Sequence, residues 1–294
     1  MGGTDVDQVH ARVLGWYAEH RRDLPWRRPG CTPWGVLVSE VMLQQTPVAR
    51  VEPVWTRWME RWPTPGALAA AAPGEAVRAW DRLGYPRRAL RLHAAAGAIV
   101  ERHAGEVPDE EDALRALPGV GAYTAAAVAA FAFGRRTAVV DTNVRRVHAR
   151  WVTGRALPAP ALTAAETSLA ATLLPVDEPT AATWSVAVME LGALVCTARS
   201  PRCAGCPLVD LCAWVAAGSP PHDGPPRRGQ AWEGTDRQCR GRLLQVLREA
   251  EGAVVGDRLR AVWPHEAQRD RCLDGLVSDG LVEPLARDRY RLPA

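Results

Sequence analysis

The sequence predicts an all-α protein that ends in a small C-terminal domain. Apolar residues recur at helical spacing through most of the chain, and prolines and glycines break the pattern at intervals. Alternation of apolar and polar residues, the signature of strands, is scarce before residue 250. The 294 residues are 47% hydrophobic and 23% charged, which suits about two packed domains.

The predicted helices follow one another along the chain. Residues 5–20 form the first, with Val9, Val13 and Tyr17 on one face. Residues 34–62 form two helices, joined within 47–53 where two prolines fall. Further breaks at 63–66, 84–86 and 108 separate the helical segments that fill the intervals.

The last quarter of the chain predicts a linker and a separate domain. Proline and glycine dominate 218–229, and we set the linker at 216–235 and the domain at 236–294. Three helical patterns precede a possible hairpin at 282–292, an order that suits a winged helix-turn-helix or another small helical appendage. Its charges nearly balance, which argues against strong DNA binding by this domain.

Composition also limits location and partners. No apolar run approaches the length of a membrane span, and the N-terminus lacks a signal pattern, so we expect a soluble cytoplasmic protein without membrane contact. Net charge is only +3, but residues 135–155 hold six arginines and one acid, Asp141. This stretch is either a solvated basic face or a surface that contacts phosphates. All 36 basic residues are arginine, so the chain has no lysine.

Four cysteines near residue 200 predict a metal site. Cys196, Cys203, Cys206 and Cys212 follow the spacing C-x6-C-x2-C-x5-C, within 17 residues. Four thiolates can hold zinc or an iron–sulfur cluster. Disulfides are less expected in a cytosolic chain.

Two carboxylates stand out by their settings. Glu40 is the lone acid in the apolar run 36–43, where an ionised carboxylate is costly if buried. It is either a functional acid or a solvent-facing helix residue. Asp141 directly precedes a predicted helix and is at least a candidate N-cap. Between them, residues 117–134 predict a tight turn through Gly119 and Gly121 whose backbone N–H groups could bind an anion.

Taken together, these motifs resemble the helix-hairpin-helix glycosylase superfamily, and within it the MutY-type adenine DNA glycosylases. The resemblance covers about residues 5–215, and it is carried by RRDLPWR, SEVMLQQT, LGYPRRALRLHAAA, LPGVGAYTA, VVDTNVRRV and WSVAVMELGALVCTARSPRCAGCPL. It implies two helical lobes with a DNA cleft between them. Residues 24–134 would form a six-helix lobe, and residues 1–23 with 135–215 a lobe with a [4Fe-4S] cluster on the four cysteines.

The resemblance also implies roles for single residues. Glu40 would protonate a flipped adenine, since an apolar setting raises the pKa of a carboxylic acid. Asp141, ionised in a more polar setting, would stabilise the oxocarbenium-like sugar. Tyr123 occupies the position of the catalytic lysine of lyase-type relatives. The other implied contacts are Trp26, Arg27 and Glu190 in the adenine pocket, Gln45 and Thr46 near the opposite purine, Tyr85 as an intercalating wedge, and Gly119 and Gly121 at a phosphate.

The sequence departs from the family pattern at three points. Pro86 replaces the usual second aromatic after Tyr85, and Thr142 replaces a common glycine after Asp141. The tail is too short for the MutT-like Nudix domain with which many members read 8-oxoguanine. The opposite-base preference is therefore the least determined property.

Three functions remain open from the sequence. The first is a monofunctional glycosylase that removes adenine opposite 8-oxoguanine or guanine, acting as a nucleoid-associated monomer on double-stranded DNA. The second is an endonuclease III-like glycosylase and lyase, or a mismatch thymine glycosylase. The third is a winged-helix regulator with an iron–sulfur redox sensor, which would leave Glu40 and Asp141 without a role. Glu40 and the absence of lysine favour the first.

Overall fold

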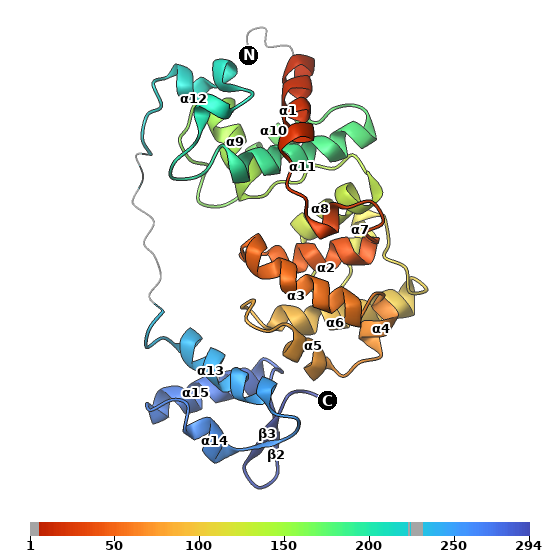
Figure 1. The fold of residues 1–294 in the computed structure, drawn as a ribbon, viewed down its shortest axis with the longest axis vertical. Helices are drawn as coiled ribbons and strands as arrows, with labels where there is room; N and C mark the ends of the chain where they lie inside the picture. Colours follow the sequence, from red (N-terminus) through yellow and green to blue (C-terminus); the bar gives the residue numbers. More distant parts are fainter. Residues whose placement is uncertain (1–5, 223, 225–231) are drawn as a thin grey trace. The chain divides into compact units, whose positions relative to one another are not determined.

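The computed structural model in Figure 1 describes residues 6–222, 224 and 232–294. Helices fill most of this part of the chain, and the strands in it all begin at Val254 or later, which confirms the all-α prediction. None of the described helices is both long and apolar enough to cross a membrane. The chain divides into two compact units, each of which is considered by itself.

The first unit comprises residues 1–36, 109–115 and 120–225. Its elements are α1 (Val6–His20), η1 (Pro25–Arg27), α7 (Glu111–Arg115), α8 (Ala122–Phe133), α9 (Thr142–Trp151), α10 (Ala164–Thr172), α11 (Glu178–Leu194), η2 (Cys203–Gly205), η3 (Val209–Leu211) and α12 (Ala213–Ala216). Residue 5, the predicted start of the first helix, lies outside the described residues.

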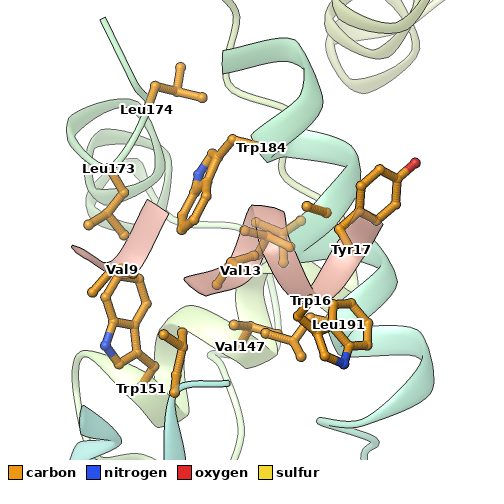
Figure 2. Close-up of a cluster of buried hydrophobic side chains, with 14 of the residues drawn as sticks. Val9, Val13, Trp16, Tyr17, Val147, Trp151, Leu173, Leu174, Trp184 and Leu191 are labelled. Carbon is orange, nitrogen blue, oxygen red and sulfur yellow. The ribbon is translucent and has the colours of Figure 1, made fainter. Parts of the chain in front are cut away.

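The core of the first unit gathers around α1. Val9, Val13 and Tyr17 recur at helical spacing on α1 and are buried with Trp184 and Leu191 of α11. Figure 2 shows these side chains converging with those of α9. Full burial of each large apolar side chain contributes about 1.5–3 kcal/mol, which explains why segments far apart in sequence are held together.

Side-chain caps fix where helices of this unit begin. Thr163 and Glu166 form a capping box at α10, and Asp177 accepts a hydrogen bond from the Thr180 N–H at α11. Asp141 caps α9 in the same way. Each cap stabilises its helix by about 1 kcal/mol, because it satisfies N–H groups that have no partner inside the helix.

The second unit comprises residues 37–108, 116–119 and 226–294. Its elements are the larger part of α2 (Pro33–Leu43), then α3 (Val48–Arg61), α4 (Pro65–Ala69), α5 (Pro73–Ala79), α6 (Arg87–Arg102), α13 (Asp236–Glu249), β1 (Val254–Val255), α14 (Gly256–Arg260), α15 (Glu266–Ser278), β2 (Glu283–Leu285) and β3 (Arg289–Arg291). Helices α2 and α3 are separated by residues 44–47, and Pro53 lies inside α3 instead of at the predicted junction.

The C-terminal segment has the element order of a winged helix. The elements follow in the order α13, β1, α14, α15, β2, β3, so that the three expected helices and the final hairpin are joined by a further short strand, β1. The strands form an antiparallel sheet in the order β1-β3-β2. This segment packs on α5 through reciprocal arginine contacts. Arg78 donates to the carbonyls of Leu247 and Arg248, while Arg248 donates from Nε to the Val77 carbonyl at 2.9 Å. Cations at helix C-termini are stabilised by the exposed carbonyls and the helix dipole.

The last residues of the chain also contact α5. The Gly74 N–H donates to the Pro293 carbonyl at 2.8 Å, and a Cβ at Gly74 would lie 2.4 Å from that oxygen. The domain boundaries given above for 24–134, 1–23 with 135–215, and 236–294 stay predictions. Part of the predicted linker 216–235, namely 223 and 225–231, lies outside the described residues.

Candidate active site

Glu40 is a buried acid on α2. Its relative exposure is 5%, and its neighbours Val36, Leu37, Val38, Val41 and Met42 are buried as well. Thr32 starts the helix by accepting a hydrogen bond from the Gly35 N–H at 3.2 Å. The alternative of a solvent-facing side chain is therefore wrong, because Glu40 is buried on a helix where the apolar residues around it are buried too.

The turn that follows α2 and the turn that precedes α6 are both strained. Gln45 has φ +55° and Tyr85 has φ +46°, in a region that side chains other than glycine rarely occupy. Tyr85 is 56% exposed, whereas Thr46 is buried and donates from Oγ1 to the Leu83 carbonyl at 3.2 Å. The two turns are thus tied to each other, with Tyr85 presented to solvent.

The predicted hairpin glycines occupy different environments. Gly119 has φ +78°, and a Cβ there would lie 2.6 Å from Cβ of Arg91. Gly121 is the extended residue before α8, and no atom lies within 4 Å of the place a Cβ would take. Tyr123, in the first turn of α8, packs against a buried cluster that includes Ala127.

Asp141 is both an N-cap and a partly buried carboxylate. Oδ1 accepts from the N–H groups of Asn143 and Val144 at 2.8 and 2.7 Å, and Oδ2 accepts from Asn143 Nδ2 at 2.7 Å. Burial raises the pKa of Asp141, while these hydrogen bonds and the charge of Arg146 oppose that rise. Asp141 therefore has polar contacts, but the net direction of its pKa shift is upward because burial outweighs them.

A chain of contacts joins Asp141 to the cysteine loop. Arg146 donates from Nη2 to Asn143 Oδ1 at 2.8 Å and to the Gly192 carbonyl at 2.7 Å. Its Nε donates to the Cys196 carbonyl at 2.6 Å. Because Asn143 also binds Asp141, the position of this carboxylate depends on the start of the cysteine loop.

The four cysteines lie in the irregular segment after α11. Arg150 Nη1 lies 3.4 Å from Sγ of Cys196, and Cys212 Sγ lies 3.5 Å from the Arg150 carbonyl. Burial raises the pKa of Cys206 to about 11 and that of Cys203 also, with neighbouring cysteines adding to both. Thiolates here need a cation, which a bound iron–sulfur group supplies together with Arg150.

No three His, Cys, Asp or Glu side chains in the described ranges are placed to hold a single metal ion. The residues do suit a larger group, because the four thiols lie close enough for their charges to interact.

Glu190 on α11 is fully buried and held by two arginines. Arg22 donates from Nε to Oε1 at 2.8 Å and from Nη2 to Oε2 at 2.7 Å. Arg27 Nη1 lies 2.9 Å from Oε2 as an ion pair. These arginines outweigh burial and lower the pKa of Glu190 to about 2. Trp26, next to Arg27 in η1, is buried at 6% exposure. The predicted pocket residues 26, 27 and 190 all belong to the first unit.

Three arginines that organise these residues are not predicted by the sequence. Arg22 lies in the RRDLPWR segment, but nothing in the sequence connects it with Glu190. Arg146 belongs to the basic stretch 135–155, for which the sequence predicts a solvated face or a phosphate surface, yet Arg146 is buried. Arg88 is also buried and binds main-chain carbonyls. Motif spacing gives no signal for such long-range contacts, whether the acceptor is a carboxylate or a main-chain carbonyl.

Two protein families match parts of this chain. Residues 38–170 match the HhH-GPD superfamily base excision DNA repair proteins, and residues 196–212 match the iron–sulfur binding domain of endonuclease III. The second match includes all four cysteines, and an iron–sulfur cluster is therefore the cofactor of this loop.

Individual relatives narrow the family. The chain is 57% identical to the adenine DNA glycosylase of Mycobacterium tuberculosis over 283 residues, which is 96% of this chain and 92% of that protein. It is 42% identical to the human adenine DNA glycosylase over 217 residues, which is 71% of this chain and 40% of that protein. A thymine/uracil-DNA glycosylase of Pyrobaculum aerophilum is 34% identical over 211 residues, which is 71% of this chain and 91% of that protein.

Solved structures agree on the fold. A thermostable thymine-DNA glycosylase gives a TM-score of 0.64 at 28% identity, covering 72% of this chain and 97% of that one. An endonuclease III in a non-covalent DNA complex gives 0.61 at 25% identity, covering 74% and 99%. On these grounds the chain belongs to the adenine DNA glycosylases, base excision DNA repair enzymes of the HhH-GPD superfamily that carry an iron–sulfur domain of the endonuclease III type.

Proposed function

We propose that this enzyme binds duplex DNA in which adenine is paired with 8-oxoguanine or guanine, and hydrolyses the N-glycosidic bond of that adenine without a lysine nucleophile. Removal of adenine is the activity of the family to which the chain belongs. The observation that most directly supports the mechanism is the burial of Glu40, an acid with 5% exposure in an apolar helix. Base flipping would bring the adenine to it, because the bond is inaccessible inside the duplex.

In this proposal Glu40 acts as general acid. Cleavage leaves a base anion and a cationic sugar, and a proton donated to the ring nitrogen N7 removes the charge on the leaving base. A general acid is effective when its pKa lies near the working pH, and an apolar setting shifts a carboxylic acid in that direction.

Asp141 would stabilise the oxocarbenium-like sugar and guide the attacking water. Its two oxygens already accept three hydrogen bonds from the first turn of α9, so its orientation is fixed before substrate arrives. Preorganised charge of this kind lowers the barrier because no reorganisation is needed during the reaction. Tyr123 would occupy the place that an amine nucleophile takes in lyase-type relatives.

The adenine pocket would use Trp26, Arg27 and Glu190. Glu190 stays ionised at neutral pH because its pKa is about 2, and it can accept a hydrogen bond from the exocyclic amine of adenine. Trp26 offers an apolar surface, and Arg27 remains close to Glu190. These three groups favour a purine that carries an amine over one that carries a carbonyl at the same position.

Contacts with the duplex would come from the strained turns and the hairpin. Gln45 and Thr46 would lie near the opposite purine, and Tyr85 would enter the base stack as a wedge. Gly119 and Gly121 would let backbone N–H groups approach a phosphate. The iron–sulfur cluster supplies a cross-link that fixes the cysteine loop, while Arg146 and Arg150 hold Cys196 from α9.

We propose further that the enzyme discriminates 8-oxoguanine from guanine less strongly than relatives with a MutT-like domain do, and that it acts as a monomer on nucleoid DNA in the cytoplasm. The C-terminal segment supports the first point, because several of its charged residues pair with one another. Arg271 pairs with Asp236, Arg260 with Asp257 and Asp288, and Arg269 with Asp270.

A base-release assay on a panel of duplexes tests the proposal. Single-turnover rates would be measured on duplexes with A opposite 8-oxoguanine, guanine or thymine, and with T or U opposite guanine. Faster release of adenine opposite the two guanines than from the A:T pair supports the proposal. Preferential release of T or U would favour the activity named for the Pyrobaculum relative and contradict it.

A further inference from the structure

The two turns proposed to probe the duplex are held in costly conformations. Gln45 at φ +55° and Tyr85 at φ +46° both lie in the left-handed region, which is unfavourable for a residue with a side chain. Such conformations persist only where surrounding contacts determine them. The contacts that determine these two turns converge on one side chain, Arg88 of α6.

Arg88 binds the residue that precedes each strained position. Nη1 donates to the Gln44 carbonyl at 2.6 Å, and Nη2 donates to the Gly84 carbonyl at 3.2 Å. Nη2 also lies 3.3 Å from Thr46 Oγ1, on the far side of Gln45. One guanidinium therefore fixes the spacing between the two turns as well as the shape of each.

The same guanidinium reaches the end of the helix that carries Glu40. Nη1 donates to the Val41 carbonyl at 2.8 Å, the residue directly after Glu40. This carbonyl belongs to the last turn of α2, where unpaired carbonyls and the helix dipole favour a cation. Arg88 thus joins the C-terminus of α2 to both turns.

Packing explains why only arginine suits this position. Arg88 is 7% exposed, and its guanidinium carbon lies 5.4 Å from the ring centroids of both Trp80 and Tyr85. Trp80 supports the same turn by donating from Nε1 to the Gly84 carbonyl at 2.9 Å. A flat group with several fixed donors can lie between two rings and serve acceptors in different directions, whereas an ammonium cannot.

The arrangement is costly in the absence of a functional reason. Among the described residues no carboxylate forms an ion pair with Arg88, and its Nε is buried without an acceptor. Burial lowers the pKa of Arg88 to about 10, so the side chain remains charged at neutral pH. A buried cation neutralised only by main-chain dipoles stabilises a protein less than an apolar residue would.

We infer that Arg88 is a positioning residue for mispair recognition, which holds Gln45 and Tyr85 in their strained turns at a fixed separation and ties them to the end of the Glu40 helix. The inference rests on the proposed function. It implies that loss of Arg88 impairs the steps that open a base pair more than the chemistry on an adenine that is already unpaired.

The test compares two substrates in Arg88→Gln and Arg88→Lys. Single-turnover release would be measured for adenine opposite 8-oxoguanine and for adenine opposite an abasic site, where no opposite purine is probed. We expect Arg88→Gln to lose about tenfold more rate on the first duplex than on the second. Arg88→Lys should lie between wild type and Arg88→Gln on the first duplex, since one nitrogen cannot reach both turns.

A spectroscopic readout and a control separate positioning from general destabilisation. 2-Aminopurine beside the mispair should brighten when wild type inserts its wedge and stay dark with Arg88→Gln. Arg248→Gln is the matched control, because Arg248 also caps a helix of this unit with a guanidinium and burial also lowers its pKa to about 10. It should lose rate equally on both duplexes.

Two results would overturn the inference. One is an equal loss on both duplexes for Arg88→Gln at matched thermal stability. The other is the same selective loss in Arg248→Gln. Failure of the proposed function has a different appearance, since wild-type enzyme would then release no adenine from either duplex.

Discussion

Arg22 donates hydrogen bonds to both carboxylate oxygens of Glu190, from Nε to Oε1 at 2.8 Å and from Nη2 to Oε2 at 2.7 Å. The two residues are 168 positions apart in the sequence. The Arg22 backbone N–H adds a third hydrogen bond to Oε1 at 3.0 Å. Bidentate contacts between charged groups are strong and directional, so Glu190 is both ionised and fixed in orientation. Its charge should therefore be constant over the pH range in which the enzyme works.

The lowered pKa of Glu190 predicts that the ratio of wild-type to Glu190→Gln rates does not depend on pH. A carboxylate whose folded pKa is about 2 contributes its full stabilisation above the unfolded value of about 4.3, and this stabilisation declines progressively as pH falls from there through about 2. Glu190→Gln should lower single-turnover adenine release by about 10- to 100-fold. The ratio of wild-type to variant rates should not change between pH 5 and 9, and a ratio that bends in this range would contradict the assignment.

Glu40→Gln should abolish adenine release while duplex binding stays within a few fold. Glutamine keeps the shape of the buried side chain but has no transferable proton, so the leaving base stays anionic. A loss of about 10³-fold is expected for a missing general acid. Glu60→Gln is the control, because Glu60 is an exposed acid on α3 of the same unit. Near-wild-type rates in Glu40→Gln would exclude Glu40 as the acid.

Asp141→Asn should impair chemistry and leave the fold intact. The amide oxygen can still accept hydrogen bonds from the backbone of Asn143 and Val144, so the α9 cap survives, but the negative charge opposite the sugar cation is lost. We expect a loss of about 10²-fold or more in rate with little change in Tm. Asp177→Asn, which alters the cap of α11, is the control and should keep full activity.

The raised pKa of Asp141 adds a pH dependence to this comparison. Because burial makes its folded pKa higher than that of an ordinary aspartate, the carboxylate is protonated at a higher pH than usual. Wild-type activity should fall on the acid side as this charge disappears, whereas Asp141→Asn has no such charge to lose. An acid limb of equal position in both proteins would assign that limb to another group.

Sequence patterns predicted the helices and the helix cap at Asp141, because both depend on local information. Apolar spacing on α1 gave the buried face that contains Val9 and Val13, and the position of Asp141 before α9 indicated a cap. The predicted helix break at Pro53 is wrong, because local propensity disfavours proline inside a helix while the buried side chains of α3 keep this helix continuous through Pro53.

The contacts that set the geometry of the site were not predictable in the same way. Arg88 and Arg22 bind partners 44 and 168 positions away, and main-chain carbonyls carry no residue code that a sequence could show. The left-handed conformations of Gln45 and Tyr85 were not predictable from the sequence either, because neither residue is glycine. Both cases arise where the fold imposes a conformation that local propensity disfavours.

The hairpin glycines give a paired prediction that separates stability from DNA contact. Gly119→Ala forces a side chain into positive φ and against Arg91, so the free energy of unfolding should fall by about 2 kcal/mol or more. Gly121→Ala meets no atom within 4 Å and has extended φ, so Tm should hardly change. If Gly121 lies at a phosphate, its alanine variant should still weaken duplex binding. Unchanged affinity would remove Gly121 from the proposed phosphate site.

The enzyme should release adenine without cleaving the strand. Lyase chemistry needs an amine that attacks the sugar and forms a Schiff base, and a desolvated lysine supplies it because it can lose its proton. Arginine stays protonated, and the chain contains no lysine at any of its 294 positions. Tyr123, in the first turn of α8, has a phenol that cannot form an imine.

We therefore propose that water completes the displacement, with Asp141 as the group that positions or deprotonates it. The product should be an intact abasic strand that breaks only after alkali or heat, and borohydride should trap little covalent complex. The N-terminal amine is the single remaining primary amine, so chemical acetylation of that group serves as the control. Efficient trapping that tracks with adenine release and disappears on acetylation would show that the terminus is the nucleophile, and that a chain without lysine can still be a lyase.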